Sequence, residues 1–398
     1  MRPIGRRRAL GLWEELPVDK VRCGVIGTGG MGSGHCRMIQ DIPEVELTAV
    51  CDIDPEVSKS VAAQYEVPGF TDHLKLLDSG LVDMVIIATP HYFHPPIAID
   101  AFERGIHVMS EKPLAVTVSA ADAVIAAWKK TNLKFGIMYQ MRTEGRNIAA
   151  RKLIDEGRLG EIYRTSMVMG WYRSQAYYES GGWRATWTGE GGGVLINQSP
   201  HMLDLYTWLC GLPSKITGGV ATRIHDIEVE DEAYAVLEYP NGAHGYLHAS
   251  VTEAPGVDRI EICGDRGKLL LEDGKLRFWE LETPIKEFTR TCTEMWASPK
   301  AHEVPVEVPQ EPSGHGVVTR KFARSILYDE PMVVCGADGL NAVEMIDGII
   351  LSGKRGKPVS VPVDRAEYDA LILELKASSR AKTTVREQRI TDPKFAQP

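Results

Sequence analysis

The sequence predicts an α/β protein of two domains, a doubly wound domain followed by one built on a mixed or antiparallel sheet. From Val21 to Arg142, short β-branched runs alternate with helix-length segments, which is typical of βαβ units on a parallel sheet. After Arg142 several strands follow one another with short turns such as 240–242, which favours an antiparallel or mixed sheet. The chain has 398 residues, enough for two or three domains at about 150 residues each.

The first domain is expected over 21–142, after an extension, 1–20, that we interpret as disordered or ancillary. Its strands are the apolar runs, and the segments between them, such as 55–65 and 118–130, predict helices. The expected strands are 21–27, 45–52, 83–90, 107–113 and 134–139.

The second domain is expected over 143–363, and the charged segment 364–398 predicts a surface helix followed by a frayed tail. Residues 281–314 are rich in Pro, Thr and Glu and predict an extended loop. The expected strands are 161–171, 216–224, 232–239, 243–252, 258–263 and 268–280, and the expected helices are 145–157, 315–328 and 337–353.

Composition limits the kind of protein. Hydrophobic residues make up 43% and charged residues 25%, which indicates a soluble, folded chain. The net charge of −9 disfavours nucleic acid as a partner, and no apolar run approaches the roughly 18 residues of a membrane span. The seven cysteines form no C-x-x-C pair or zinc-type spacing, so we expect a reduced, cytoplasmic protein without a metal.

A glycine fingerprint follows the first expected strand. Gly27, Gly29 and Gly32 fit G-x-G-x-x-G, with Gly30 and Met31 between them. In this pattern the first glycine makes the tight turn, the second lets the backbone approach a pyrophosphate, and the third lets the helix pack on the strand. The helix start then offers free N–H groups to the phosphates.

Asp52 ends the next expected strand, 20 residues beyond Gly32. A carboxylate there accepts hydrogen bonds from the adenosine ribose and repels a 2′-phosphate, so NAD is favoured over NADP. The alternative is a structural glycine turn with Asp52 as a helix cap. Asp54 is the better cap, because it directly precedes Pro55 and a helical run.

Candidate catalytic groups come from two distant segments. Lys112 follows the strand that ends near residue 110, and the carboxyl ends of such strands face the ligand. Asn197, His201 and Asp204 recur at i, i+4 and i+7 of an expected helix within 189–211, which puts a polar row on one face.

Oxidation of a secondary alcohol needs a base near the hydroxyl oxygen. His201, with an ordinary pKa of about 6.5, suits this role at neutral pH. Lys112 shares it if burial lowers its pKa, and otherwise stabilises the alkoxide as a cation. Asn197 is expected to orient the hydroxyl. A surface lysine and a structural helix histidine are the alternatives.

Taken together, these segments resemble the glucose–fructose oxidoreductase, inositol dehydrogenase and MocA (Gfo/Idh/MocA) family over residues 21–363. The resemblance rests on the fingerprint with Asp52 and on four further segments, which are TPHYFHPPIA (89–98), EKP (111–113), GGGVLINQSPHMLDL (191–205) and 337–362. It implies an N-terminal Rossmann domain and a C-terminal α/β domain whose large open, mixed or antiparallel sheet forms a homodimer or homotetramer.

The resemblance also implies hydride transfer with sugars or polyols, and roles for single residues. Lys112 matches a lysine that contacts cofactor and substrate, and His201 matches a histidine that exchanges the hydroxyl proton. Asn197 departs from the aspartate of inositol dehydrogenase-like members, and His91 stands where many members have asparagine. The further cofactor contacts are expected at Thr89, Pro90, His94 and Glu111.

An aromatic segment, 171–187, precedes the expected catalytic helix. Aromatic faces stack on sugar C–H groups and arginines donate to hydroxyl or carboxylate oxygens, so we expect substrate contacts here, with core or interface packing as the alternative. Tyr172 and Arg184 are the favoured pair. Tyr139 and Arg142, at the end of the last expected Rossmann strand, are predicted to face the same pocket.

The sequence therefore predicts an NAD-dependent oxidoreductase acting on a secondary alcohol of a sugar, sugar derivative or polyol, with Lys112 and His201 as proton relay. A second hypothesis is a glycosidase or lyase that uses bound NAD transiently and produces no net NADH. A third is a non-catalytic NAD-binding regulator, against which the presence of both Lys112 and His201 argues.

Overall fold

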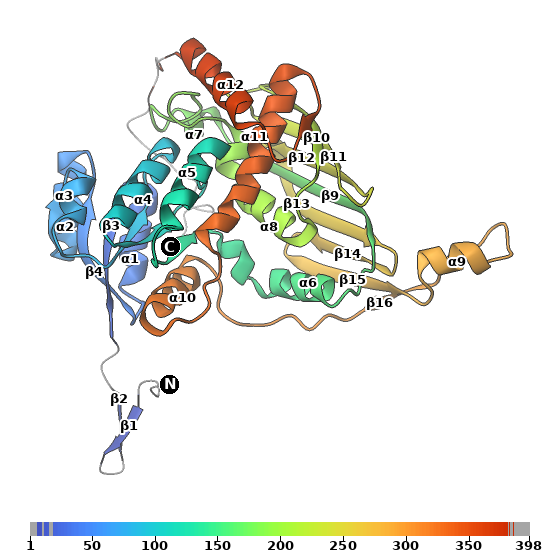
Figure 1. Ribbon diagram of the computed structural model, residues 1–398, viewed down its shortest axis with the longest axis horizontal. Coiled ribbons are helices and arrows are strands. Elements are labelled where there is room, and N and C mark those ends of the chain that lie inside the picture. The colour runs from blue at the N-terminus through green and yellow to red at the C-terminus, as the bar shows by residue number, and fades with distance from the viewer. Residues whose placement is uncertain (1–5, 10–11, 16–18, 381, 383–384, 386–398) are drawn as a thin grey trace.

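The computed structural model describes all residues except 1–5, 10–11, 16–18, 381, 383–384 and 386–398 (Figure 1). The prediction for the extension 1–20 therefore falls partly outside the described residues. Within it, β1 (Arg6–Ala9) and β2 (Leu12–Glu15) pair antiparallel. Most of the predicted tail also lies outside, after α12 (Arg365–Ser378), which is the predicted surface helix.

The first sheet has six parallel strands in the order β5-β4-β3-β6-β7-β8. The five predicted strands are present, and β5 is an additional strand of two residues. The strands are β3 (Val21–Ile26), β4 (Val45–Cys51), β5 (Gly69–Phe70), β6 (Met84–Ile87), β7 (His107–Ser110) and β8 (Phe135–Ile137). Because the order reverses between β3 and β6, the carboxyl ends of these two strands flank the crevice where such sheets bind ligands.

Helices cover both faces of this sheet, which is why every residue of β6 is buried. They are α1 (Gly30–Ile39), α2 (Pro55–Tyr65), α3 (His73–Leu77), α4 (His94–Glu103) and α5 (Val118–Trp128), with the 3₁₀ turns η1 (His91–Phe93) and η2 (Gln140–Thr143). The predicted Rossmann domain is thus confirmed.

The second sheet has nine strands in the order β16-β15-β14-β13-β9-β12-β11-β10-β17. Its centre, β9 (Ile162–Tyr172), runs parallel to β12 and antiparallel to β13, so the sheet is mixed, as predicted. The other strands are β10 (Lys215–Ala221), β11 (Glu232–Glu238), β12 (His244–Ser250), β13 (Thr252–Gly264), β14 (Gly267–Glu272), β15 (Lys275–Leu281), β16 (Ala301–Val304) and β17 (Val359–Ser360).

Two local predictions for this sheet were wrong. The single strand expected at 268–280 is the hairpin β14–β15, whose turn is Asp273-Gly274 with positive φ at both residues. Asp-Gly is a typical sequence for that turn. The expected loop 281–314 contains α9 (Ile285–Thr291) and β16, which pairs with β15 through Phe278 and Val304. Figure 1 shows α9 projecting from the body.

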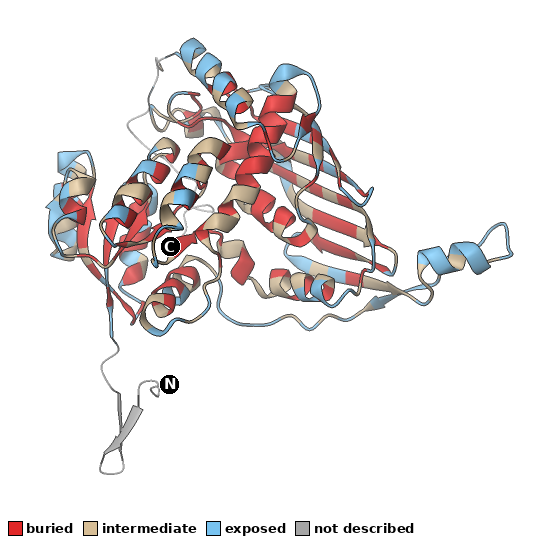
Figure 2. Cartoon of the chain, in the orientation of Figure 1, coloured by how far each residue is buried: buried red, intermediate tan, exposed pale blue. Residues whose placement is uncertain are grey.

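One face of the second sheet is covered by α6 (Gly145–Asp155), α8 (Pro200–Cys210) and α11 (Gly339–Arg355) (Figure 1). Residues 342–352 of α11 are all buried, and the helix contacts both β10 and α5 (Figure 2). The strands alternate buried and exposed residues. Tyr234, Val236 and Tyr246 are among the exposed apolar side chains of β11 and β12.

One helix crosses back from the second half of the chain. Although the sequence groups it with residues 143–363, α10 (His315–Tyr328) packs against the first sheet, where Phe322 joins the core cluster of Val25 and Met84. Its Arg320 and Arg324 both donate to the buried carboxylate of Glu44. The two halves of the chain are thereby interlocked.

Replacing Phe322 with Ala should lower the free energy of unfolding by about 3 kcal/mol, because a fully buried ring is removed from the core. Urea unfolding followed by circular dichroism measures this. Tyr328→Ala, on the same helix but 42% exposed, is the control and should cost less than about 1 kcal/mol. Equal losses in the two variants would contradict this packing.

Candidate active site

The glycine loop between β3 and α1 leaves room for a ligand only on its outer side. Gly27 has a φ of +86°, and a Cβ there would lie 2.8 Å from the carbonyl of Ala88. A Cβ on Gly32 would lie 1.8 Å from the carbonyl oxygen of Gly27, so the helix approaches the strand as closely as backbone allows. Gly29 and Gly30 face open space. No side chain caps the start of α1, which leaves its N–H groups to a phosphate.

Asp52 lies against this loop. Its Oδ2 accepts a hydrogen bond from the Thr28 backbone N at 2.8 Å, and its Oδ1 accepts one from the Asp54 backbone N at 3.0 Å. Asp54 is the cap of α2, because its side chain accepts from the N–H groups of Glu56 and Val57. The Asp52 carboxylate thus lies at the glycine loop, where a dinucleotide ribose would need it. Met31, in the first turn of α1, is half-exposed at this opening.

Lys112 follows β7 and reaches across to the second half of the chain. Its Nζ donates to the backbone oxygen of Asn197 at 2.7 Å. Burial lowers the pKa of Lys112, and the charge of Arg184 acts in the same direction, whereas Glu111 and Glu190 oppose the shift. A lysine with this environment gives up its proton more readily than an exposed one.

Glu111 is held by a histidine from α1. His35 Nε2 donates to its Oε1 at 2.7 Å, inside the core. Burial alone would raise the pKa of Glu111, but the hydrogen bond and the charge of His35 prevail, with help from His315 and Lys112, and bring it to about 2. Glu111 is therefore an anion at neutral pH, next to Lys112.

The segment that carries Asn197 is not the start of a long α-helix. Residues Val194–Gln198 form a turn of π-helix, and α8 begins at Pro200. The buried carboxylate of Glu230 accepts from the N–H groups of Gly193 and Leu195 and so fixes the start of this turn. The one regular helix predicted for Asn197, His201 and Asp204 is therefore wrong, because Asn197 lies in the π-helical turn, whereas His201 and Asp204 lie in α8.

His201 stands near Lys112, with its ring edge-on to Tyr139 at 6.0 Å between centroids. Burial and the charge of Lys112 lower the pKa of His201 to about 3, so the prediction of an ordinary histidine base is corrected. The imidazole stays neutral at neutral pH and holds a proton weakly. Among the described residues, no hydrogen-bond partner meets His201 Nδ1, the Tyr139 hydroxyl or Thr89 Oγ1, all of which are buried. Buried polar atoms in this state suit a bound polar ligand.

Glu190, which the sequence analysis did not select, belongs to the same cluster. Its Oε1 accepts from Asn197 Nδ2, and its Oε2 accepts from the backbone N of Ala185. Burial raises the pKa of Glu190, and the charges of Arg184 and Lys112 act against that rise. The signal in the sequence was one acidic residue inside the glycine run GEGGG.

Tyr172 and Arg184, the favoured substrate contacts, lie in different surroundings. Tyr172 is 56% exposed at the end of β9, whereas Arg184 stacks on Tyr177, with its Cζ 4.7 Å from the ring centroid. Arg184 Nη1 also donates to the Tyr177 hydroxyl at 2.8 Å, and Gln198 Nε2 donates to the same oxygen at 3.1 Å. Tyr177, in the short helix α7 (Gln175–Tyr178), is thus the tyrosine that connects the aromatic segment to the turn carrying Asn197.

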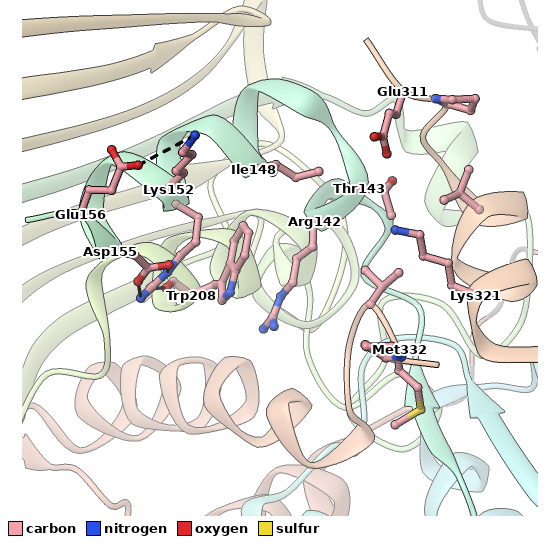
Figure 3. Close-up of a pocket in the computed structure, with 15 residues that line it drawn as sticks. Arg142, Thr143, Ile148, Lys152, Asp155, Glu156, Trp208, Glu311, Lys321 and Met332 are labelled. Carbon is pink, nitrogen blue, oxygen red and sulfur yellow. Dashed lines mark hydrogen bonds and ion pairs between the residues drawn. The ribbon is translucent and has the colours of Figure 1, made fainter. Parts of the chain in front are cut away.

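Arg142 is held by carboxylates, contrary to its predicted role in the substrate pocket. It donates to Asp204 twice, at 2.9 and 2.6 Å, and to Asp338, in the 3₁₀ turn η4 (Gly336–Asp338), at 3.2 Å. Burial raises the pKa of Asp204 to about 6 in spite of this partner. Arg142 lines a separate cavity of about 530 Å³, with Trp208 and Lys321 among the other residues of its wall (Figure 3).

His94 and His91 have structural contacts. The ring nitrogens of His94 lie 2.7 Å from the backbone oxygen of Thr89 and 2.8 Å from that of Pro113, so the ring joins the two loops at the crevice. His91 Nδ1 donates to the backbone oxygen of Glu190 at 3.0 Å. We predicted that His94 contacts the cofactor directly. Because both of its ring nitrogens meet backbone oxygens, it is better suited to holding Thr89 and Pro90 in place.

The described part of the chain contains neither a metal-type cluster of side chains nor a membrane-spanning helix. No cluster of three or more His, Cys, Asp or Glu side chains in it has the arrangement of a metal site. Within the same residues, no helix has the length and apolarity needed to cross a bilayer.

Comparison with known proteins identifies the family. Residues 21–139 match the model for the oxidoreductase family with an NAD-binding Rossmann fold, and residues 148–270 match the GFO/IDH/MocA C-terminal domain. The chain belongs to the GFO/IDH/MocA family. Its resemblance to that family, its two-sheet fold and NAD as its cofactor are thereby confirmed, and the chain is an NAD-binding oxidoreductase.

Characterised relatives are similar over most of their length. The scyllo-inositol 2-dehydrogenase (NAD(+)) of Bacillus subtilis is 28% identical over 267 residues, which are 65% of this chain and 75% of the relative. The 2,7-anhydro-N-acetylneuraminate hydratase of Mediterraneibacter gnavus is 27% identical over 284 residues, covering 67% and 74%. The WlbA dehydrogenase of Bordetella pertussis, solved with NADH and UDP-GlcNAcA, superposes with a TM-score of 0.73 at 26% identity, covering 87% of this chain and 100% of that one.

Asp52→Ala should weaken NADH binding roughly tenfold, because the charged acceptor next to the glycine loop is lost. It should also narrow the preference for NADH over NADPH. Fluorescence titration with both nucleotides measures this. The control is Asp54→Ala, which removes a helix cap two residues away and should leave the ratio of the two affinities unchanged. An unchanged ratio in Asp52→Ala would contradict the assignment.

Proposed function

We propose that the chain is an NAD-dependent dehydrogenase that moves a hydride between a secondary alcohol of a sugar, sugar derivative or polyol and the nicotinamide. The observation that supports this most is the position of Lys112. Lys112 follows a strand of the dinucleotide-binding domain. Its amine is buried and donates to the backbone oxygen of Asn197 at 2.7 Å. This is the environment of a lysine that accepts a proton.

The residues present fit a bound dinucleotide. Gly29 and Gly30 leave open space beside free N–H groups of α1, Asp52 lies at the ribose side, and buried Thr89 Oγ1 has no partner among the described residues. When bound, NAD supplies the hydride acceptor. The glycine loop and Asp52 would hold it, and the ends of β3 and β6 set where it enters.

Lys112 is the base in this proposal. In its neutral form Nζ takes the hydroxyl proton as the hydride leaves the carbon, and in its charged form it stabilises the alkoxide in the reverse direction. His201 is neutral and binds protons weakly, so it hydrogen-bonds the hydroxyl and passes the proton on, without storing it. Asn197 orients the hydroxyl.

The site and the relatives together support the proposed substrate class. The Tyr139 hydroxyl and His201 Nδ1 offer polar contacts, and Tyr177 with Arg184 offers an aromatic face beside a cation. The similar scyllo-inositol dehydrogenase acts on a polyol, and the WlbA dehydrogenase structure holds a nucleotide sugar. We further propose that the exposed sheet face with Tyr234, Val236 and Tyr246 joins copies into a homodimer or homotetramer.

A redox-neutral reaction is the second candidate, since a hydratase is among the similar proteins. In such a reaction Lys112 would remove and return protons during a transient oxidation. The two candidates differ in one observable, because only the dehydrogenase accumulates NADH.

The experiment is a panel of inositols, aldoses and uronates with NAD, and of their keto derivatives with NADH, followed by the absorbance of NADH. The wild type should accumulate NADH with at least one member. Lys112→Met should lower kcat by roughly 10³-fold, because the base is lost, while NADH affinity changes little. Lys129→Met, at an exposed lysine of the same domain, is the control with normal turnover.

Product formation without NADH would contradict the dehydrogenase in favour of the redox-neutral reaction. Full activity of Lys112→Met would contradict the assignment of the base under either reaction.

A further inference from the structure

We propose that Glu190 is a positioning residue, whose carboxylate fixes the side-chain amide of Asn197 so that its oxygen, Oδ1, is the end available to accept a hydrogen bond from a second substrate hydroxyl, beside the reacting one. This inference rests on the proposed dehydrogenase function and adds a residue to it. It assigns a task to a buried carboxylate of this cluster that the reaction scheme leaves unused.

Glu190 is anchored through its backbone and its side chain. It is 1% exposed, its backbone N donates to Thr186 O at 2.9 Å, and its backbone O accepts from His91. The side chain accepts from Ala185 N through one oxygen and from Asn197 Nδ2 through the other. Because both oxygens accept N–H groups, the ionised carboxylate is the form that fits the geometry.

The chemistry of the pair sets the direction of the amide. An asparagine side chain has a donor end and an acceptor end, and an ionised carboxylate only accepts. Nδ2 must therefore face Glu190, which leaves Oδ1 as the other end of the amide. If the amide were free to turn, this second hydroxyl would meet a donor for part of the time, and the substrate would be held less firmly with its reacting hydroxyl at Lys112.

Asn197 also connects Glu190 to Lys112. The same residue presents its side chain to Glu190 and its backbone oxygen to Lys112 Nζ. Glu190 therefore acts on the reaction through Asn197, and its charge balances those of Lys112 and Arg184 nearby. Catalytic contact with the substrate remains with Lys112, His201 and Asn197.

An exchange of the two functional groups tests the pair. Glu190→Gln offers one acceptor oxygen to two N–H donors, so the Asn197 amide turns or loses its bond, and kcat should fall tenfold or more. Asn197→Asp places two carboxylates in contact, and its kcat should fall at least as far as that of Glu190→Gln. In the double variant, the new amide at position 190 can accept from Ala185 N and donate to the new carboxylate at position 197. Its kcat should therefore recover to within about threefold of the wild type.

The readouts separate positioning from simple structural support. The Kd for NADH and the thermal midpoint should stay near wild type in Glu190→Gln while kcat falls. Glu228→Gln is the matched control, since that carboxylate also accepts hydrogen bonds from backbone and side-chain groups but lies outside this pair, and its kcat should be unchanged.

Two results would overturn the inference. If the wild type forms NADH and Glu190→Gln equals it, or if the double variant shows the product of the two single losses, Glu190 does not position Asn197, while the proposed dehydrogenase function stands. If the wild type forms no NADH with any member of the panel, the dehydrogenase function fails and this inference fails with it.

Discussion

The hydrogen bond from Lys112 Nζ to the backbone oxygen of Asn197 joins the two halves of the candidate site at the proposed base. Lys112 is supplied by the parallel sheet, which brings it to the carboxyl edge where such sheets bind nucleotides. Asn197 is supplied by a π-helical turn of the other domain, which removes the lysine from water. Burial between the two halves is the main cause of the lowered pKa of Lys112, so the chemistry depends on how firmly the halves are docked. The return of α10 to the first sheet and the burial of α11 against α5 maintain that docking.

The ionisable groups around this hydrogen bond differ in their partners and in their protonation. Glu111 is paired with His35 below Lys112 and remains an anion, whereas Glu190 is directed at Asn197. His201 is neutral because burial and Lys112 disfavour a charge on its ring. The site therefore has one group, Lys112, that exchanges a proton readily, and several groups that hold their protonation state. A dehydrogenase needs such an asymmetry to direct the proton and the hydride to different acceptors.

Features that depend on local sequence were predicted well. The glycine fingerprint, the Asp54 cap and the place of Lys112 at a strand end each follow from a few consecutive residues and a known sheet geometry. The sequence did not reveal the pKa of His201, because burial arises from packing of distant segments. The sequence predicted that Arg142 lies at the edge of the first sheet, but not which groups its guanidinium binds. Those partners, Asp204 and Asp338, are 62 and 196 residues away in the chain. Glu190 was missed because its importance lies in a contact that only the turn at 194–198 creates.

The central claim is that docking of the two domains lowers the proton affinity of Lys112. It is tested most directly by NMR titration of lysine labelled at ¹³Cε and ¹⁵Nζ, with the Lys112 signal assigned by its absence in Lys112→Arg. We expect a pKa below the ordinary 10.5 for this lysine, and a further fall when oxidised cofactor adds its positive charge. A pKa at or above 10.5 would contradict it.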